Sequence, residues 1–356
     1  MRLTARLVPF LVASLLAAAC SGSDEDPAAP ADTTAPTTTV ASEPDDTTDT
    51  TEPAEPHDTV TTSIADGTVR ASVERLILDG YPGGTEIELT ADGQTITAVT
   101  DDRGNLVIAD IPPGDWQVAV VGNADTADVT IVSAADSVPD QSFYDGQTLT
   151  EGYQYIEMRD GTLLAANVFL PPGPGPFVTV VEYSGYSPAK PGNDFVEAVN
   201  ALGVPAEGLC PSTPVICNAP DQSGSLFAYA TDFAVVAVNM RGTGCSGGTA
   251  GFFDLAQRLD GYDVIEAVAA QEWVKNNQVG MVGLSYPGIT QLYVAAEQPP
   301  SLAAVAPFSV IDDMTRDVIA PGGIPNLGFA AAWGDNLRAS SAPYGQGWEQ
   351  GLVDAG

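Results

Sequence analysis

Basic residues are scarce in this sequence. Only 12 Lys and Arg stand against 47 Asp and Glu among 356 residues, which gives a formal net charge of -35. Binding to a phosphate backbone depends on clustered Lys and Arg that release counterions, and attraction to an anionic lipid surface makes the same demand. The sequence therefore predicts no nucleic-acid partner and no electrostatic attachment to anionic lipid.

Histidine and cysteine are also scarce. The sequence has a single His, His57, and four scattered Cys, none of them paired at the spacing of a structural zinc site. We expect no metal site and no cofactor, and chemistry that needs a histidine must use His57 or a histidine from outside these residues. Apolar residues still make up 44% of the chain, which is enough for a core, and the length fits roughly two domains.

A short hydrophobic leader occupies residues 1–20. Arg2 and Arg6 precede an apolar run that is too short to span a bilayer as a helix, and three Ala stand directly before Cys20. This pattern resembles the bacterial lipoprotein signal, in which the chain is cleaved before the Cys and that Cys is lipidated. The alternative is an ordinary secretory signal. Both readings predict export, either to the outer face of the cytoplasmic membrane through a lipid on Cys20 or into the medium.

Residues 21–62 are predicted to be a disordered acidic linker. They contain no Lys, Arg or aromatic residue and consist mainly of Thr, Pro, Ala, Asp and Glu. Such a segment cannot bury enough apolar surface to offset its loss of conformational entropy, and like charges keep it extended. His57 lies inside this linker, so we expect it to be a solvated residue without a catalytic role.

Residues 63–145 are expected to form a small all-β sandwich. Short β-type runs alternate with Gly, Asp and Pro turns, and the turns at 100–105 and 111–116 resemble those of carboxypeptidase-regulatory or transthyretin-like modules. Such a module could bind carbohydrate or a partner, or it could be a rigid spacer. The predicted strands cover Val69–Leu78, Thr85–Thr90, Thr95–Thr100, Asn105–Ile108, Trp116–Val121 and Ala127–Val132.

From residue 146 the pattern becomes α/β. Nearly unbroken apolar runs at Phe177–Glu182, Phe233–Asn239 and Val279–Leu284 predict strands buried on both faces of a parallel sheet. A helix is expected between the last two, with Asp260 as its N-cap. The fold class is therefore α/β, preceded by the small β sandwich and the linker.

The strongest chemical signal is the segment Gly283-Leu284-Ser285-Tyr286-Pro287-Gly288. A buried strand runs into Ser285, and a helix is expected to begin near Tyr286. A Ser on such a turn exposes its hydroxyl above the sheet, where backbone N–H groups at the helix N-terminus can stabilise an oxyanion. The usual motif is G-x-S-x-G, whereas here Pro287 occupies the position of the second Gly.

Four other segments accompany this serine motif in a recognisable order. The five segments are Met158–Leu164, Val180–Tyr186, Asn239–Gly248, Asp260–Asp263 and Gly283–Gly288. Together they resemble the Xaa-Pro dipeptidyl-peptidase and cocaine-esterase-like (CocE/NonD) serine hydrolases, the peptidase S15 group, over roughly residues 150–356. The resemblance implies the N-terminal part of an α/β-hydrolase domain over 146–356, with a helical cap that starts at about residue 311.

The resemblance also assigns roles to residues. It implies that Ser285 is the nucleophile, with the backbone N–H of Tyr286 and the side-chain hydroxyl of Tyr186 as oxyanion donors. Tyr183 is the competing candidate for the second donor. The Arg241–Ser246 segment is expected to be scaffold.

The sequence offers no evident general base for Ser285. In the family the order is Ser, then Asp or Glu, then His, yet no His follows Ser285, and Lys190 and Lys275 are poor substitutes. We therefore expect the acid and the histidine to lie outside residues 1–356 and these residues alone to be inactive.

Cysteine use agrees with export. With Cys20 lipidated, three Cys remain, and a disulfide between Cys210 and Cys217 would close a short loop. Cys245 could instead take either partner.

Two classes of function remain open. The first is an extracytoplasmic serine hydrolase that acts on a small acyl or peptide substrate, as an Xaa-Pro dipeptidyl-peptidase or a carboxylic ester hydrolase, through an acyl-enzyme. The alternative is a non-catalytic surface lipoprotein that uses the β sandwich for binding.

Overall fold

The computed structural model describes residues 61–186, 188–189, 200, 219–220 and 222–340, all within one compact unit of the chain. The leader with Cys20, nearly all of the predicted linker, and the pair Cys210 and Cys217 lie outside the described residues. The predictions that concern them are therefore not tested by the fold.

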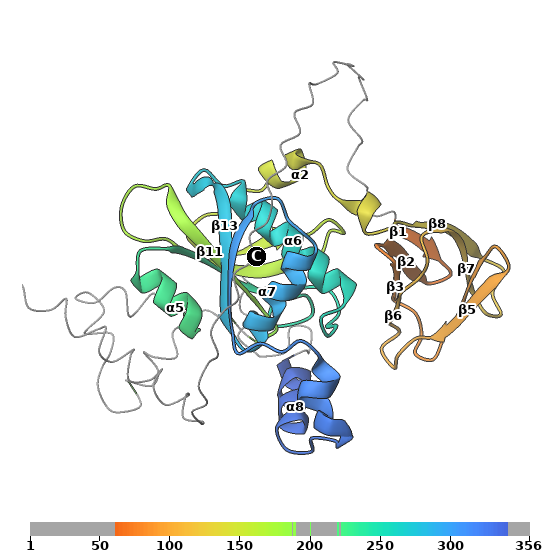
Figure 1. Cartoon of the computed structure of the whole chain (residues 1–356). Helices are drawn as coiled ribbons and strands as arrows, with labels where there is room; N and C mark the ends of the chain where they lie inside the picture. Colours follow the sequence, from red (N-terminus) through yellow and green to blue (C-terminus); the bar gives the residue numbers. More distant parts are fainter. Residues whose placement is uncertain (1–60, 187, 190–199, 201–218, 221, 341–356) are drawn as a thin grey trace, which may run out of the picture. The chain divides into compact units, whose positions relative to one another are not determined.

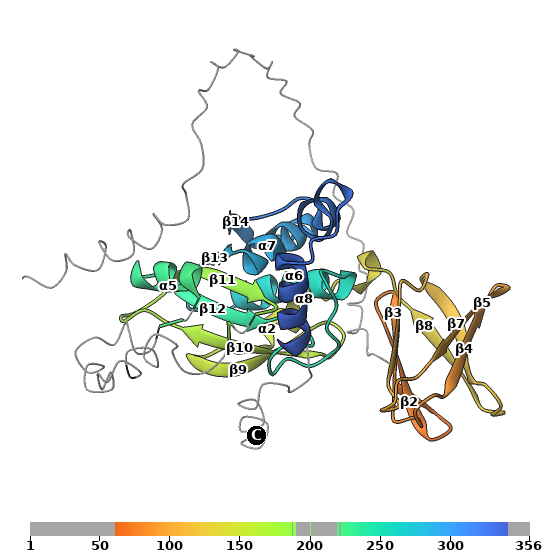
Figure 2. The ribbon, with the colours of Figure 1, turned by 90° about the horizontal axis from the view of Figure 1, so that it is seen from below.

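Residues 61–131 form two four-stranded antiparallel sheets, ordered β1-β2-β3-β6 and β5-β4-β7-β8. The two layers are visible in Figure 2. They share one core, to which Leu76 belongs in the first sheet and Leu89 and Trp116 in the second. The strands are β1 (Thr61–Ile64), β2 (Gly67–Ser72), β3 (Arg75–Asp79), β4 (Glu86–Ala91), β5 (Gln94–Val99), β6 (Leu106–Ala109), β7 (Gly114–Val120) and β8 (Thr126–Ile131).

The prediction of one strand over Val69–Leu78 is wrong. The chain instead makes a tight hairpin between β2 and β3, in which Ser72 pairs with Arg75 and Glu74 adopts a positive φ of 51°. The sequence does not indicate this turn, because the turn contains no Gly or Pro and because Val73 within it is apolar and buried like its strand neighbours.

A larger sheet has six strands in the order β14-β13-β11-β12-β10-β9. The neighbours among β14, β13, β11 and β12 are parallel, whereas β10 and β9 add an antiparallel edge. All three strands predicted as buried are present, and every residue of β12 is buried. The strands are β9 (Gly152–Glu157), β10 (Leu163–Phe169), β11 (Phe177–Ser184), β12 (Ala234–Asn239), β13 (Val274–Leu284) and β14 (Leu302–Phe308).

Helices cover both faces of this sheet. Val180 and Val235 pack with Ala228 of α5 (Ser223–Ala230) on one face. The alternate residues Val181 and Val236 belong to the core shared with α6 (Leu255–Ala269) and α7 (Tyr286–Ala296), which lie side by side in Figure 1. This alternation is what period-2 side-chain placement on a strand requires. The remaining elements are η2 (Ala135–Ser137), α2 (Gln141–Asp145), the π-helical turn η5 (Thr315–Ile319), η6 (Pro321–Gly323) and α8 (Phe329–Ser340).

The start of α6 differs from the prediction. Its N-cap is Asp254, whose side chain accepts a hydrogen bond from the Gln257 N–H at 2.9 Å, whereas Asp260 is buried inside the helix. Asp260 fits the cap rule equally well by sequence, and only its burial against Arg241 shows its different role. Within the described residues, no helix has the length and apolar content needed to cross a bilayer.

Candidate active site

Ser285 occupies the sharp turn between β13 and α7. Strand β13 ends at Leu284, the helix begins at Tyr286, and Ser285 between them has φ 66° and ψ -120°. A positive φ is uncommon for a residue with a side chain, and such backbone strain is concentrated at functional sites. The geometry matches the predicted nucleophile turn, in which the hydroxyl stands at the carboxyl end of a parallel strand.

The glycines around Ser285 are required by close contacts. A Cβ on Gly283 would lie 2.5 Å from the Pro287 side chain, and one on Gly288 would lie 2.5 Å from the carbonyl oxygen of Phe308 on β14. Pro287 is accepted in the first turn of α7 because N–H groups there have no intrahelical partner. The shifted glycine of the motif therefore lets the helix approach β14.

The structure brings Tyr186 to Ser285. The Tyr186 hydroxyl lies 3.5 Å from Ser285 Oγ, although the two residues are 99 positions apart. Two bonds hold the Tyr186 backbone: its N–H donates to Ser184 Oγ at 3.0 Å, and its carbonyl accepts from Asn239 Nδ2 at 3.0 Å. Tyr183 is buried, and its hydroxyl donates to the Gln257 carbonyl at 2.8 Å. Of the two candidates, only Tyr186 is placed to act on Ser285.

Tyr286 directly follows the serine and offers its backbone N–H. As the first residue of α7, it has no carbonyl four residues earlier within the helix to accept from its N–H. Its buried ring lies 4.7 Å from that of Phe253 and 5.4 Å from that of Tyr186, measured between centroids. Burial raises the pKa of the Tyr286 phenol, so this side chain stays neutral. The N–H of Tyr286 and the O–H of Tyr186 are thus two hydrogen-bond donors beside the Ser285 side chain, which is the kind of arrangement that can stabilise an oxyanion.

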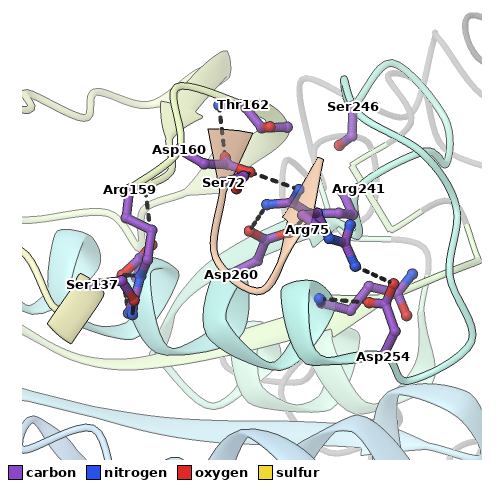
Figure 3. Close-up of polar contacts among 12 residues, drawn as sticks. Ser72, Arg75, Ser137, Arg159, Asp160, Thr162, Arg241, Ser246, Asp254 and Asp260 are labelled. Atoms are coloured by element: carbon purple, nitrogen blue, oxygen red, sulfur yellow. Dashed lines mark hydrogen bonds and ion pairs between the residues drawn. The ribbon is translucent and has the colours of Figure 1, made fainter. Parts of the chain in front are cut away.

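A buried ion cluster supports the loop after β12 (Figure 3). Arg241 pairs with Asp160 at 2.9 Å and also with Asp260, and all three side chains are less than 5% exposed. Burial by itself would raise the pKa of Asp160, but the Arg241 charge and its hydrogen bonds outweigh burial and hold this pKa well below its usual value. Ser246 of the same loop accepts from the Ala165 N–H at 2.9 Å and donates to the Asn239 carbonyl at 2.7 Å. The segment is bonded as scaffold, as the sequence predicts.

The β2–β3 hairpin is joined to the same cluster. Ser72 Oγ donates to Asp160 at 3.2 Å, and Arg75 pairs with Asp254 at 2.9 Å, with the Arg75 side chain only 6% exposed. Asp254 directly follows Phe253, whose ring contacts Tyr286. Residues so far apart in the chain carry no local signal of pairing, so the sequence alone does not predict these contacts.

Glu182 is a second buried group whose environment the sequence alone does not predict. It is 1% exposed on β11, and it accepts a hydrogen bond from the Ser225 hydroxyl of α5. Burial raises the pKa of Glu182 to about 7, although the bond from Ser225 acts in the opposite direction. The sequence does hold one signal that could have identified this group: Glu182 is the single acidic residue in a strand that is otherwise largely apolar and β-branched.

The described residues do not supply a general base of the usual kind. They contain no histidine, since His57 lies outside them. They also hold no group of three or more His, Cys, Asp or Glu placed to bind a metal ion. The site as described consists of the Ser285 hydroxyl, the Tyr186 hydroxyl 3.5 Å from it, and the backbone N–H of Tyr286.

A mixed sheet with helices on both faces and a serine on the strand-to-helix turn defines the α/β-hydrolase fold. The chain belongs to the X-Pro dipeptidyl-peptidase (S15) family, which it matches over residues 160–353. The expected family and the α/β-hydrolase fold class are thereby confirmed.

Several known proteins resemble this chain over part of its length. A Mycobacterium bovis protein whose name describes it as a serine esterase is 27% identical over 181 residues, which are 51% of this chain and 28% of that protein. Among solved structures, a CocE/NonD family hydrolase from Staphylococcus aureus is 30% identical, with a TM-score of 0.44, over 58% of this chain and 35% of that one. An aminopeptidase from a marine sediment Thaumarchaeota archaeon is 20% identical, with a TM-score of 0.37, over 51% and 28% respectively. The chain thus spans 28% of the length of the curated relative.

Proposed function

We propose that the protein is an extracytoplasmic serine hydrolase that cleaves acyl bonds through a covalent acyl-enzyme on Ser285. The observation that carries the proposal is the strained Ser285 turn with the Tyr186 hydroxyl 3.5 Å from Ser285 Oγ. Membership of the S15 family and the relative named as a serine esterase support it.

The chemistry would proceed in two steps. Ser285 Oγ attacks the substrate carbonyl and loses its proton to a general base that the described residues do not supply. The Tyr286 N–H and the Tyr186 O–H donate to the oxygen as it becomes an oxyanion, and the alcohol or amine then leaves with a proton. Water hydrolyses the acyl-enzyme and returns Ser285 to its free form.

A fluorophosphonate probe tests the nucleophile in the whole protein. The wild type should be labelled on Ser285, and Ser285→Ala should abolish labelling and turnover. Ser309→Ala is a matched control, because Ser309 is an exposed serine beyond the neighbouring strand β14. Labelling that persists in Ser285→Ala, or a whole protein that neither reacts nor turns over, would refute the proposal and favour the non-catalytic binding lipoprotein.

The substrate is proposed to be a carboxylic ester or an Xaa-Pro peptide. Parallel assays with p-nitrophenyl acetate and Ala-Pro-p-nitroanilide separate the two, because only a dipeptidyl-peptidase releases nitroaniline from the second compound. Turnover of the ester alone would assign an esterase. Both activities must disappear in Ser285→Ala.

We also propose that the protein is held at the outer face of the cytoplasmic membrane by a lipid on Cys20. The support is the leader sequence, in which three Ala precede this Cys. Metabolic labelling with an alkyne fatty acid should mark the wild type but not Cys20→Ser. Unlabelled wild-type protein in the medium would instead show an ordinary secretory signal.

A further inference from the structure

A tryptophan from the last described helix reaches the proposed oxyanion donor. The indole Nε1–H of Trp333, on α8, donates a hydrogen bond to the Tyr186 hydroxyl oxygen at 3.0 Å. The same oxygen lies 3.5 Å from Ser285 Oγ. The three side chains therefore form a chain of polar contacts that ends at the nucleophile.

The chemistry of these groups determines which of them donates and which accepts in each hydrogen bond. An indole N–H can only donate, so the Tyr186 oxygen must be the acceptor in its bond with Trp333. The phenolic proton rotates about the C–O bond and settles where an acceptor is available. With an acceptor site of its oxygen filled by Trp333, Tyr186 is left to donate on the side of Ser285.

The indole is held in place by other rings. Trp333 stacks on Phe329 with an interplanar angle of 15°, and it meets Phe252 and Tyr286 edge to face at centroid distances of 5.7 and 6.0 Å. Aromatic contacts of these kinds fix ring orientation as well as burying area. The Nε1–H therefore points at Tyr186 from a defined position.

We propose that Trp333 is a positioning residue for the reaction at Ser285, because its N–H orients the Tyr186 hydroxyl toward the substrate oxyanion. The inference rests on the proposed function. A hydrogen bond received by a hydroxyl also strengthens the bond that the hydroxyl donates. Trp333 thus acts through Tyr186, and the helix that follows the core sheet completes the oxyanion site.

The test uses Trp333→Phe, Tyr186→Phe and the double variant in the whole protein, with p-nitrophenyl acetate as substrate. Tyr186→Phe should lower kcat by about 100- to 1000-fold, as the loss of one oxyanion donor does elsewhere. Trp333→Phe keeps a ring between its aromatic neighbours and should lower kcat about three- to tenfold with little change in KM. In the Tyr186→Phe background, Trp333→Phe should cost nothing further.

Phe329→Leu is the matched control, because it alters the stacking on Trp333 and leaves the indole N–H in place. It should change kcat less than Trp333→Phe does. The inference is overturned if Trp333→Phe has the wild-type kcat, or if it lowers kcat by the same factor with and without the Tyr186 hydroxyl, since that would indicate packing alone. Turnover that survives Ser285→Ala would instead overturn the proposed function itself.

Discussion

Glu182 places a carboxyl group inside the central sheet, away from the one cation on the flanking elements β12, α5 and β13. That cation, Lys275 of β13, adjoins Val274, which pairs with Phe177 at the opposite end of β11. The neighbouring strand β12 and the covering helix α5 contain no charged residue. Burial raises the pKa of Glu182 from 4.5 to about 7. Between these two values the folded protein keeps the proton and the unfolded chain releases it.

The sign of the effect on stability follows from this difference. Over the window from about pH 4.5 to 7, the folded state binds more protons, so the free energy of unfolding falls as pH rises. At 1.36 kcal/mol for each pKa unit, the group accounts for a loss of about 3 kcal/mol across the window. The loss is complete above the folded-state pKa, and below the unfolded-state pKa the stabilisation is fully present.

Replacing Glu182 by Gln removes the titration but keeps a side-chain oxygen that can accept from Ser225. Urea unfolding followed by circular dichroism at pH 5, 6, 7 and 8 should show the wild type losing about 3 kcal/mol more than Glu182→Gln between the two ends. Glu86→Gln, at an exposed position on β4, should follow the wild-type profile. Parallel pH profiles for wild type and Glu182→Gln would refute the reasoning.

Two further substitutions test the scaffold around Ser285. Arg241→Met should lower the free energy of unfolding by about 3–5 kcal/mol at neutral pH, because it leaves the buried Asp160 and Asp260 without their cation; a chemical denaturation series that shows less than about 1 kcal/mol would contradict the cluster. Gly283→Ala should cost on the order of 1–3 kcal/mol and slow fluorophosphonate labelling, because its Cβ would meet Pro287. Gly334→Ala in α8 meets nothing within 4 Å and should be neutral or slightly stabilising in a thermal unfolding assay.

The elements that the sequence predicts well are those encoded locally. The strand, turn and helix around Ser285 are specified by contiguous residues, so their placement agrees with the prediction. Tyr186 follows a recognisable strand, and its motif places it near Ser285, although only the fold separates it from Tyr183.

What the sequence does not predict depends on pairing between distant residues. Asp160 and Arg241 are 81 positions apart, and each looks like an ordinary surface residue until the fold buries both. Asp254 and Asp260 satisfy the same helix-cap rule, and the bond to the Gln257 N–H is what identifies Asp254 as the N-cap. Trp333 likewise shows nothing in the sequence that connects it with Tyr186.

The ion pair between Arg75 and Asp254 bears on the order in which the protein folds. The strand pairs of β1 to β8 need only residues 61–131, so both small sheets can form as soon as that stretch is available. Arg75, however, can form its ion pair only when Asp254, 179 residues further along the chain, has reached its place in the fold. Contacts of such long sequence separation form slowly, because loop closure must precede them. During folding, we expect Arg75 to stay hydrated until α6 is in place, so that this contact is among the last to form.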